Sequence, residues 1–239
     1  MNRGGGSDNS IERAIQMKYR YGNSWEKYPI LNGEIWRERQ TNSAVSVYDI
    51  TTGIPHWMKL AEMIYCDPPW NLGNLNTFYT KAGRDDYKDR FSDFYNSLFL
   101  CIADVSASAC YLEIGKQNLP VFKTALKSIY PVVQVWPIFY YRKNPCFLLR
   151  GGHTLQSFDF TSLDDAKIPE QAILAESATV VADFCTGQGL TAVAAYRHKK
   201  TFLGTELNAR RLAVAIDRVN KLGGQYESTV SKGYFNCAD

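Results

Sequence analysis

The sequence has little net charge and no long apolar run. Lysine and arginine number 27 against 24 aspartate and glutamate residues, so the formal net charge is only +3. A protein that coats duplex nucleic acid is usually more basic, so this balance permits a nucleic-acid partner without arguing for one. No stretch reaches the roughly 18 consecutive apolar residues of a membrane helix. We therefore expect no membrane contact.

The six cysteines never fall into a C-x-x-C or a Cys/His zinc spacing. Most lie in apolar runs, where a reduced cysteine behaves as a small hydrophobic residue. The N-terminus carries one basic residue with no apolar segment behind it, which does not fit a secretory signal. We expect no metal and a reduced, cytoplasmic setting, or the nucleoid or nucleus. The cysteines are Cys66, Cys101, Cys110, Cys146, Cys185 and Cys237.

A chain of 239 residues forms one globular domain, at most with a modest appendage. Its last third has the clearest pattern. Residues 178–183 read as a strand, a glycine turn follows, and a helix begins at Leu190. A second strand ends on Glu206, and Asn208 is placed to cap a further helix. Strand, helix, strand and helix in this order predict a parallel βαβ unit.

The glycine turn of this unit predicts a ligand site. Gly187 and Gly189 would let a ligand approach the backbone at a helix N-terminus. Glu206, at the end of the next strand, could accept hydrogen bonds from both hydroxyls of a ribose. The turn lacks the full G-x-G-x-x-G pattern, which favours an adenosine ligand with a zwitterionic tail over a dinucleotide. The alternative is an ordinary turn beside a solvated acid.

A second strand-end motif lies earlier in the chain. The apolar run 63–66 stops at Asp67-Pro68-Pro69-Trp70, because prolines remove backbone donors. Asp67 and the Pro68 carbonyl could accept the two hydrogens of a flat amine, and Trp70 offers a stacking surface. Two acceptors would aim the amine lone pair at an electrophile. The alternative is a Pro-Pro turn with a surface tryptophan.

The segments around these motifs are less regular. We predict strands over 44–50, 109–114, 132–141 and 146–149. Residues 71–90 read as a long polar loop, and a second loop runs from Gly151 to Glu170. Loops of this length in a compact domain are usually functional or mobile.

Together the motifs resemble those of the nucleic-acid amino-methyltransferases, which use S-adenosylmethionine (SAM) to methylate the exocyclic amine of adenine or cytosine. The base-holding motif [DNS]PP[YFW] of that family is matched by residues 67–70. Its cofactor motif DPFxGxG is matched by 183–189, where Cys185 departs from the pattern, and its segment G-x-E-x-N by 204–208. The resemblance covers about residues 44–222.

The resemblance implies roles for individual residues. The base would be held by Asp67, Pro68, Pro69 and Trp70. Lys167, which with Pro169 resembles the K-P segment of the family apart from the inserted Ile168, joins the implied cofactor set. That set is Asp183, Phe184, Thr186, Gly187, Gly189, Glu206, Asn208 and Lys167.

The motif order, with DPPW first, resembles the permuted, beta-type arrangement. It implies an α/β fold: a Rossmann-like SAM-dependent methyltransferase sheet, circularly permuted, with helices on both faces. Strand 44–50 would occupy the position in the sheet that the permutation otherwise leaves without a strand. The expected divisions are an N-terminal variable segment (1–43), a catalytic domain (44–225) and a C-terminal tail (226–239). The domain would comprise a catalytic half (44–150), a connecting loop (151–169) and a SAM-binding half (170–225).

Family members of this type usually carry a target-recognition region between the two halves, and this chain has little room for one. Specificity would then be weak, or come from the 71–90 loop, the N-terminal segment, a recognition subunit or a second copy. Solvated surface positions are the alternative for residues 142 and 143. The candidate nucleic-acid contacts are Lys81, Arg84, Lys88, Arg142 and Lys143.

The implied activity is methylation of adenine N6 in single- or double-stranded DNA, because the aspartate form of the motif is more often associated with adenine. A duplex target would have to flip its base into the pocket. The alternatives are cytosine-N4 or RNA adenosine methylation, or a weakly active SAM-binding subunit of a two-subunit methyltransferase. A protein-glutamine methyltransferase would show the reverse motif order.

Overall fold

The computed structural model describes residues 21–85, 90–141 and 143–230. Residues 1–20 of the predicted N-terminal segment lie outside these ranges, as do Lys88, Arg142 and Cys237.

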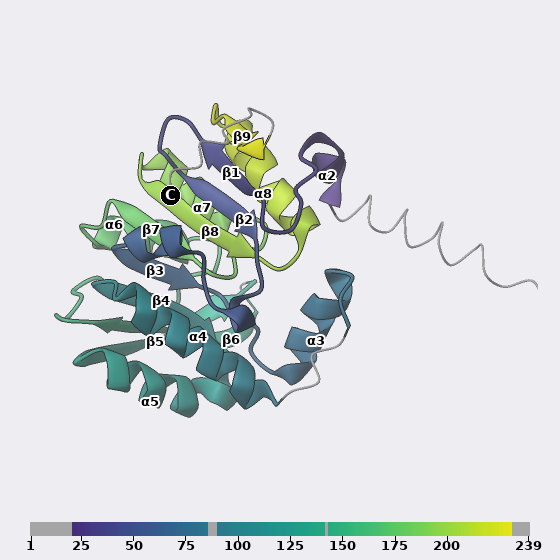
Figure 1. Ribbon diagram of the computed structural model, residues 1–239. Coiled ribbons are helices and arrows are strands. Elements are labelled where there is room, and N and C mark those ends of the chain that lie inside the picture. Colours follow the sequence, from purple (N-terminus) through teal and green to yellow (C-terminus); the bar gives the residue numbers. More distant parts are fainter. Residues whose placement is uncertain (1–20, 86–89, 142, 231–239) are drawn as a thin grey trace, which may run out of the picture.

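Strands within the described residues form one nine-stranded sheet in the order β5-β6-β4-β3-β7-β8-β2-β1-β9 (Figure 1). The centre is parallel: β3 pairs with β4 and β7, β7 with β8, and β8 with β2. The other pairings are antiparallel. The strands are β1 (Ile35–Glu38), β2 (Ala44–Val47), β3 (Met63–Cys66), β4 (Ala109–Ile114), β5 (Val132–Tyr140), β6 (Asn144–Gly152), β7 (Val180–Asp183), β8 (Thr201–Glu206) and β9 (Tyr226–Ser228).

Helices cover both faces of this sheet, as the sequence predicts (Figure 1). Buried side chains of α6, α7 and α8 form one core with the sheet, and those of α3, α4 and α5 form the other. None of the helices in the described ranges is long and apolar enough to cross a membrane. The helices are α2 (Ser24–Lys27), α3 (Leu72–Lys81), α4 (Phe91–Val105), α5 (Leu119–Ile129), α6 (Ile168–Ala175), α7 (Leu190–Arg197) and α8 (Ala209–Asn220), with 3-10 turns at Ile50–Thr52, His56–Leu60 and Lys116–Asn118.

The predicted βαβ unit is confirmed as β7-α7-β8-α8. The side-chain oxygen of Asn208 accepts hydrogen bonds from the backbone N–H groups of Arg210 (2.9 Å) and Arg211 (3.4 Å), so Asn208 caps α8 as expected. The predicted strand 44–50 is shorter in the structure: β2 ends at Val47, a 3-10 turn follows at Ile50–Thr52, and β2 pairs in parallel with β8, Val47 opposite Glu206.

The prediction of a loop over residues 71–90 is wrong, because its first half is α3. The side chain of Asn71 accepts a hydrogen bond from Asn74 N at 2.9 Å and starts the helix. Leu75 and Tyr79, four residues apart, bury one face against the core. The polar residues that suggested a loop are accommodated because the Thr77 hydroxyl donates to the carbonyl four residues earlier.

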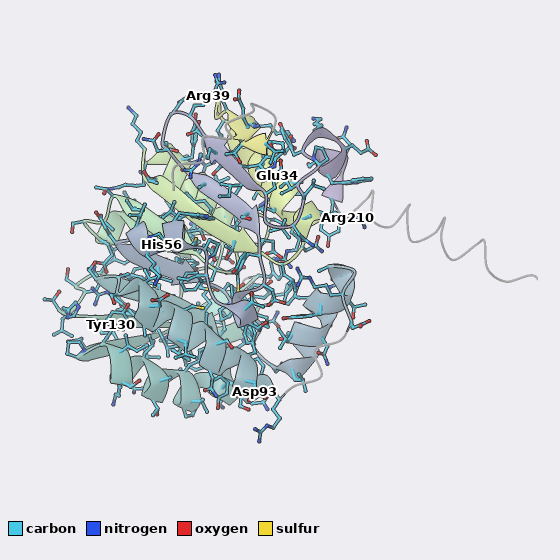
Figure 2. The ribbon with its side chains drawn as sticks, viewed as in Figure 1. Glu34, Arg39, His56, Asp93, Tyr130 and Arg210 are labelled. Atoms are coloured by element: carbon cyan, nitrogen blue, oxygen red, sulfur yellow. The ribbon has the colours of Figure 1, made fainter. Side chains whose placement is uncertain are left out.

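The second predicted loop also begins later than expected. β6 extends through Gly151 and Gly152, which pair with β4 on one side and β5 on the other. The sheet continues beyond residues 44–225 through β1 and β9. There Arg39 pairs with Glu227 at 2.7 Å, and the Ser228 hydroxyl donates to Glu34 (Figure 2).

The Asn71 cap should stabilise α3 measurably. Substitution Asn71→Ala removes the acceptor for Asn74 N and should lower the free energy of unfolding by about 1 kcal/mol. Urea denaturation followed by circular dichroism measures the change. Asn96→Ala, at an exposed position inside α4, is the matched control and should cost nothing. Equal effects of the two substitutions would contradict the capping role.

Candidate active site

The DPPW and T-G-Q-G segments meet at the carboxyl ends of β3 and β7, neighbouring parallel strands. They line a cavity of about 670 Å³. A smaller hollow of about 60 Å³ adjoins it, since Asp67, Pro69 and Arg211 line both spaces. Phe184 and Glu206 line the smaller one. The sheet therefore brings the two predicted half-sites to two adjoining spaces that share lining residues.

Trp70 is fixed in the cavity wall by contacts on several sides. Its indole N–H donates to Asp67 Oδ1 at 3.0 Å, and its backbone carbonyl accepts from the Asn118 side chain at 2.7 Å. Its ring meets Tyr140 edge to face, with centroids 5.3 Å apart. A Cβ on Gly115 would lie only 2.9 Å from Trp70 Cε3, so the glycine admits the ring. Trp70 and Asp67 thus form one positioned pair.

Opposing influences act on the pKa of Asp67. Burial raises the pKa of Asp67 to about 6, while the hydrogen bond from Trp70 and the charge of Arg211 act in the opposite direction. At neutral pH this carboxyl is therefore mostly ionised and can accept hydrogen bonds.

The glycine turn needs glycine at both predicted positions. Gly187 has φ +57° and Gly189 has φ +83°, in the left-handed region that other residues rarely adopt. A Cβ on Gly187 would come within 2.7 Å of Arg211 Nη2, and one on Gly189 within 2.5 Å of Ala215 Cβ. The turn therefore packs directly against α8.

Glu206 ties this turn to the start of α8. Its carboxylate accepts hydrogen bonds from the backbone N–H groups of Gly187 at 2.7 Å and Asn208 at 2.9 Å. The side chain is buried, and Arg211 Nε lies 3.9 Å from it. A carboxylate has about four lone-pair sites, so two remain for a ligand in the smaller hollow.

Asp183 organises the turn from the other side. Its two oxygens accept from the Cys185 backbone N–H at 2.9 Å and from the Thr191 hydroxyl at 2.7 Å. Burial raises the pKa of Asp183 to about 7, against the lowering effect of these two hydrogen bonds.

Carboxyl groups outnumber cations around the larger cavity. Because groups of both signs line the space, the lining suits a zwitterionic ligand. Within the described residues, no group of three or more His, Cys, Asp and Glu side chains is arranged to hold a metal ion. The carboxyls belong to Asp67, Glu113, Asp164, Asp165 and Asp183, and the cations to Lys81, Arg211 and Arg218.

The remaining predicted site residues fall partly inside the cavity. Pro68, Thr186 and Lys81 line it, whereas Gly189, Asn208 and Lys167 do not. Asn208 serves as the α8 cap, and Lys167 is exposed just ahead of α6. Two predicted nucleic-acid contacts also lie elsewhere. Arg84 is paired with Asp49 at 3.1 Å, and Lys143 is exposed in the β5–β6 turn.

Several cavity residues escaped sequence reasoning. Glu113 is buried in β4 and Arg211 lies in the first turn of α8. The signal for Glu113 was a lone acid in an otherwise apolar strand, one residue before its end. Arg211 offered no signal, because charged residues at the start of a surface helix are common.

The raised pKa of Asp183 predicts a pH-dependent stability. The carboxyl of Asp183 loses its proton near pH 4 in the unfolded chain and near pH 7 in the folded protein. The protonated carboxyl therefore contributes its full stabilisation of the fold below pH 4, and this contribution is lost as the pH rises to 7. Between these limits, the free energy of unfolding should fall by on the order of 4 kcal/mol more in the wild type than in Asp183→Asn.

Urea denaturation at intervals from pH 4 to pH 8 tests this. Asp104→Asn, at an exposed aspartate paired with Lys59, should keep the wild-type pH dependence. An Asp183→Asn curve parallel to the wild-type curve would show that the carboxyl does not titrate in this window.

Comparisons with known proteins relate the chain to solved structures. No protein-family model and no curated protein sequence matches it. TTHA0409 from Thermus thermophilus, provisionally assigned as a DNA modification methylase and solved with S-adenosyl-L-methionine, is 15% identical with a TM-score of 0.51. The match covers 74% of this chain and 93% of that one.

Two further solved structures are similar. The M1.HpyAVI–SAM complex is 13% identical with a TM-score of 0.50, over 74% of this chain and 98% of that one. PvuII DNA methyltransferase, cytosine-N4-specific, is 13% identical with a TM-score of 0.49, over 77% and 93%. At these identities, TTHA0409 and M1.HpyAVI establish the fold: this chain has the Rossmann-like α/β sheet of the methyltransferases.

Proposed function

We propose that this protein is a SAM-dependent methyltransferase that transfers a methyl group to the exocyclic N6 amine of adenine in DNA. One observation carries the proposal. The Asp67–Trp70 pair and the Gly187 turn with Glu206 lie on adjacent elements around the two adjoining spaces. The first can hold a flat amine, and the second can hold an adenosine ligand.

The charges around the cavity suit SAM. SAM carries a sulfonium, an ammonium and a carboxylate and no phosphate, and the lining offers both carboxyls and cations. When bound, SAM supplies an electrophilic methyl group. Glu206 would hold the ribose hydroxyls in the smaller hollow, while Asp183 and Gly187 would face the methionine end. Arg211 and Arg218, both in the lining, would neutralise its carboxylate.

The amine side of the reaction depends on Asp67. As a carboxylate it accepts one amine hydrogen, and the Pro68 carbonyl at the strand end accepts the other. The nitrogen lone pair is then directed away from the ring and toward the cofactor half of the cavity. The Trp70 ring, braced by Tyr140 and Gly115, stacks on the base. Both groups act by position and need no strong base, because the amine would lose a proton only after gaining the methyl group. The Asp67 carboxylate can take that proton, and S-adenosylhomocysteine would be the leaving product.

DNA and adenine are the finer parts of the proposal. TTHA0409 is assigned to DNA modification, and the aspartate form of the motif favours adenine within the family that the sequence resembles. The stretch between β6 and α6 spans only residues 153–167, which is too short for a recognition domain. We therefore infer that target choice depends on α3 and its surroundings, or on a recognition subunit or second copy.

Methyl transfer should depend on Asp67. The purified protein is incubated with methyl-labelled SAM and duplex DNA, single-stranded DNA or RNA, and the nucleosides are then analysed. We expect label in N6-methyladenine from DNA, and a loss of at least about 100-fold in Asp67→Ala, since an acceptor at the reacting amine is removed. Asp159→Ala, at an exposed position, is the control and should keep full activity.

The other outcomes are distinct. Label in N4-methylcytosine or in RNA would correct the target while keeping the reaction. SAM binding with no transfer to any nucleic acid would contradict the enzyme and favour a SAM-binding subunit, and sizing of the protein alone and with candidate partners would then test that role.

SAM binding should depend on Glu206. Glu206→Ala removes a buried charged acceptor and should weaken binding by about 1.5–3 kcal/mol. Isothermal titration calorimetry with SAM measures this, with Glu227→Ala at the β9 edge as the control. Glu206→Gln, which keeps one acceptor, should give an intermediate loss. Unchanged affinity in both Glu206 variants would remove the assigned role.

A further inference from the structure

Glu113 is a buried acid on the wall of the larger cavity that no part of the proposed reaction uses so far. Its side chain is only 2% exposed. β3 and β4 pair with Cys66 opposite Leu112, so Asp67 and Glu113 stand one residue further along neighbouring strands. Successive residues of a strand alternate between faces. Glu113 therefore projects from the same face of the sheet as Asp67, and both line the cavity.

One oxygen of Glu113 is engaged and the other is free. Oε1 accepts a hydrogen bond from the hydroxyl of Tyr65, on the neighbouring strand. Oε2 is buried and has no partner within the described residues. A buried polar atom without a partner costs roughly 1–3 kcal/mol, so a group that enters the cavity and bonds this oxygen gains that energy. The second oxygen of Glu113 is therefore available for a hydrogen bond to a ligand.

We propose that Glu113 reads the target base, its free oxygen forming a hydrogen bond to the ring nitrogen next to the methylated amine. The assignment rests on the proposed methyltransferase function. With the exocyclic amine at Asp67, the adjacent ring nitrogen of the base lies on the side of β4, where Glu113 stands. A ring nitrogen is an acceptor, so Glu113 must bring the proton.

The surroundings of Glu113 favour this protonated form. Acids face it from three directions: Asp67 just after β3, Asp183 at the end of β7 and Asp165 ahead of α6. Burial and the charge of Asp67 raise the pKa of Glu113 well above its usual range, against the lowering effect of the Tyr65 hydrogen bond. The buried thiol of Cys146, in β6, also lies in its field.

A protonated carboxyl selects between bases. Adenine and cytosine both place an acceptor ring nitrogen beside their exocyclic amine. Guanine and thymine place a ring N–H beside a carbonyl at the corresponding edge, and this N–H would face the O–H of Glu113. A site built around a buried hydrogen bond rejects a partner that cannot complete it. At this edge Glu113 thus favours adenine and cytosine over guanine and thymine.

The topology assigns Glu113 to the base and not to the cofactor. β3 separates β4 from β7, the strand that leads into the Gly187 turn. Neighbouring strands lie about 4.8 Å apart, so the β4 edge is about 10 Å from the β7 edge. Asp67, on the strand between them, marks where amine and cofactor meet.

The test compares single-stranded oligonucleotides that contain adenine or 1-deazaadenine, which keeps the amine but replaces ring N1 with C–H. The kcat/KM ratio of the two substrates is measured for the wild type, Glu113→Ala, Glu113→Gln and Glu38→Gln. Glu38 is equally buried but lies in β1, outside the cavity. SAM affinity of every variant is measured in parallel and reports whether the cofactor half is intact.

We expect the wild type and Glu38→Gln to prefer adenine by roughly 10- to 100-fold, the scale of one buried hydrogen bond. Glu113→Ala should lose this preference while its SAM affinity stays within about 2-fold. Glu113→Gln, whose amide can still donate, should keep most of it. A wild type that does not discriminate, or a Glu113→Ala variant that still does, overturns the assignment. No methyl transfer by the wild type overturns the proposed function and this assignment with it.

Discussion

Strand β3 forms parallel ladders with β4 on one side and β7 on the other, and the positions of Asp67, Glu113 and Asp183 in the cavity follow from these two pairings. Parallel pairing places the carboxyl ends of the three strands at one edge of the sheet, where open α/β folds bind ligands. The prolines after Cys66 end β3 at that edge, so Asp67 emerges between Glu113 and Asp183. A register shift of one residue would turn each of these side chains to the other face.

The hydrogen bond from Gly187 N to Glu206 has a similar role in the cofactor half. It joins a turn that requires positive φ to the end of β8. The backbone N–H of Asn208, at the start of α8, donates a second hydrogen bond to the same carboxylate. Asp183 holds the same turn through Cys185 and Thr191. The acids that build the site also set its electrostatics. Carboxyls and cations together line the cavity, which suits a zwitterionic cofactor.

Local chemistry decided how far the sequence could predict this arrangement. The βαβ unit, the Asn208 cap and both strand-end motifs were predictable, because periodicity, glycine and proline act over a few residues. α3 was missed because Thr77 and its polar neighbours have low helix propensity, and only the burial of Leu75 and Tyr79 offsets it. Glu113 and Arg211 were missed for another reason. Their roles arise from pairing between segments distant in the chain, and no local pattern encodes which strand lies beside which.

The central claim is that the two adjoining spaces together hold the cofactor and the target base. The most direct measurement is a crystal structure of the protein with S-adenosylhomocysteine and an adenine-containing oligonucleotide. The account predicts the ribose on Glu206, and the N6 amine within hydrogen-bond distance of Asp67 and facing the cofactor sulfur. S-Adenosylhomocysteine bound outside these spaces, or a base held away from Asp67 while the cofactor occupies its site, would contradict it.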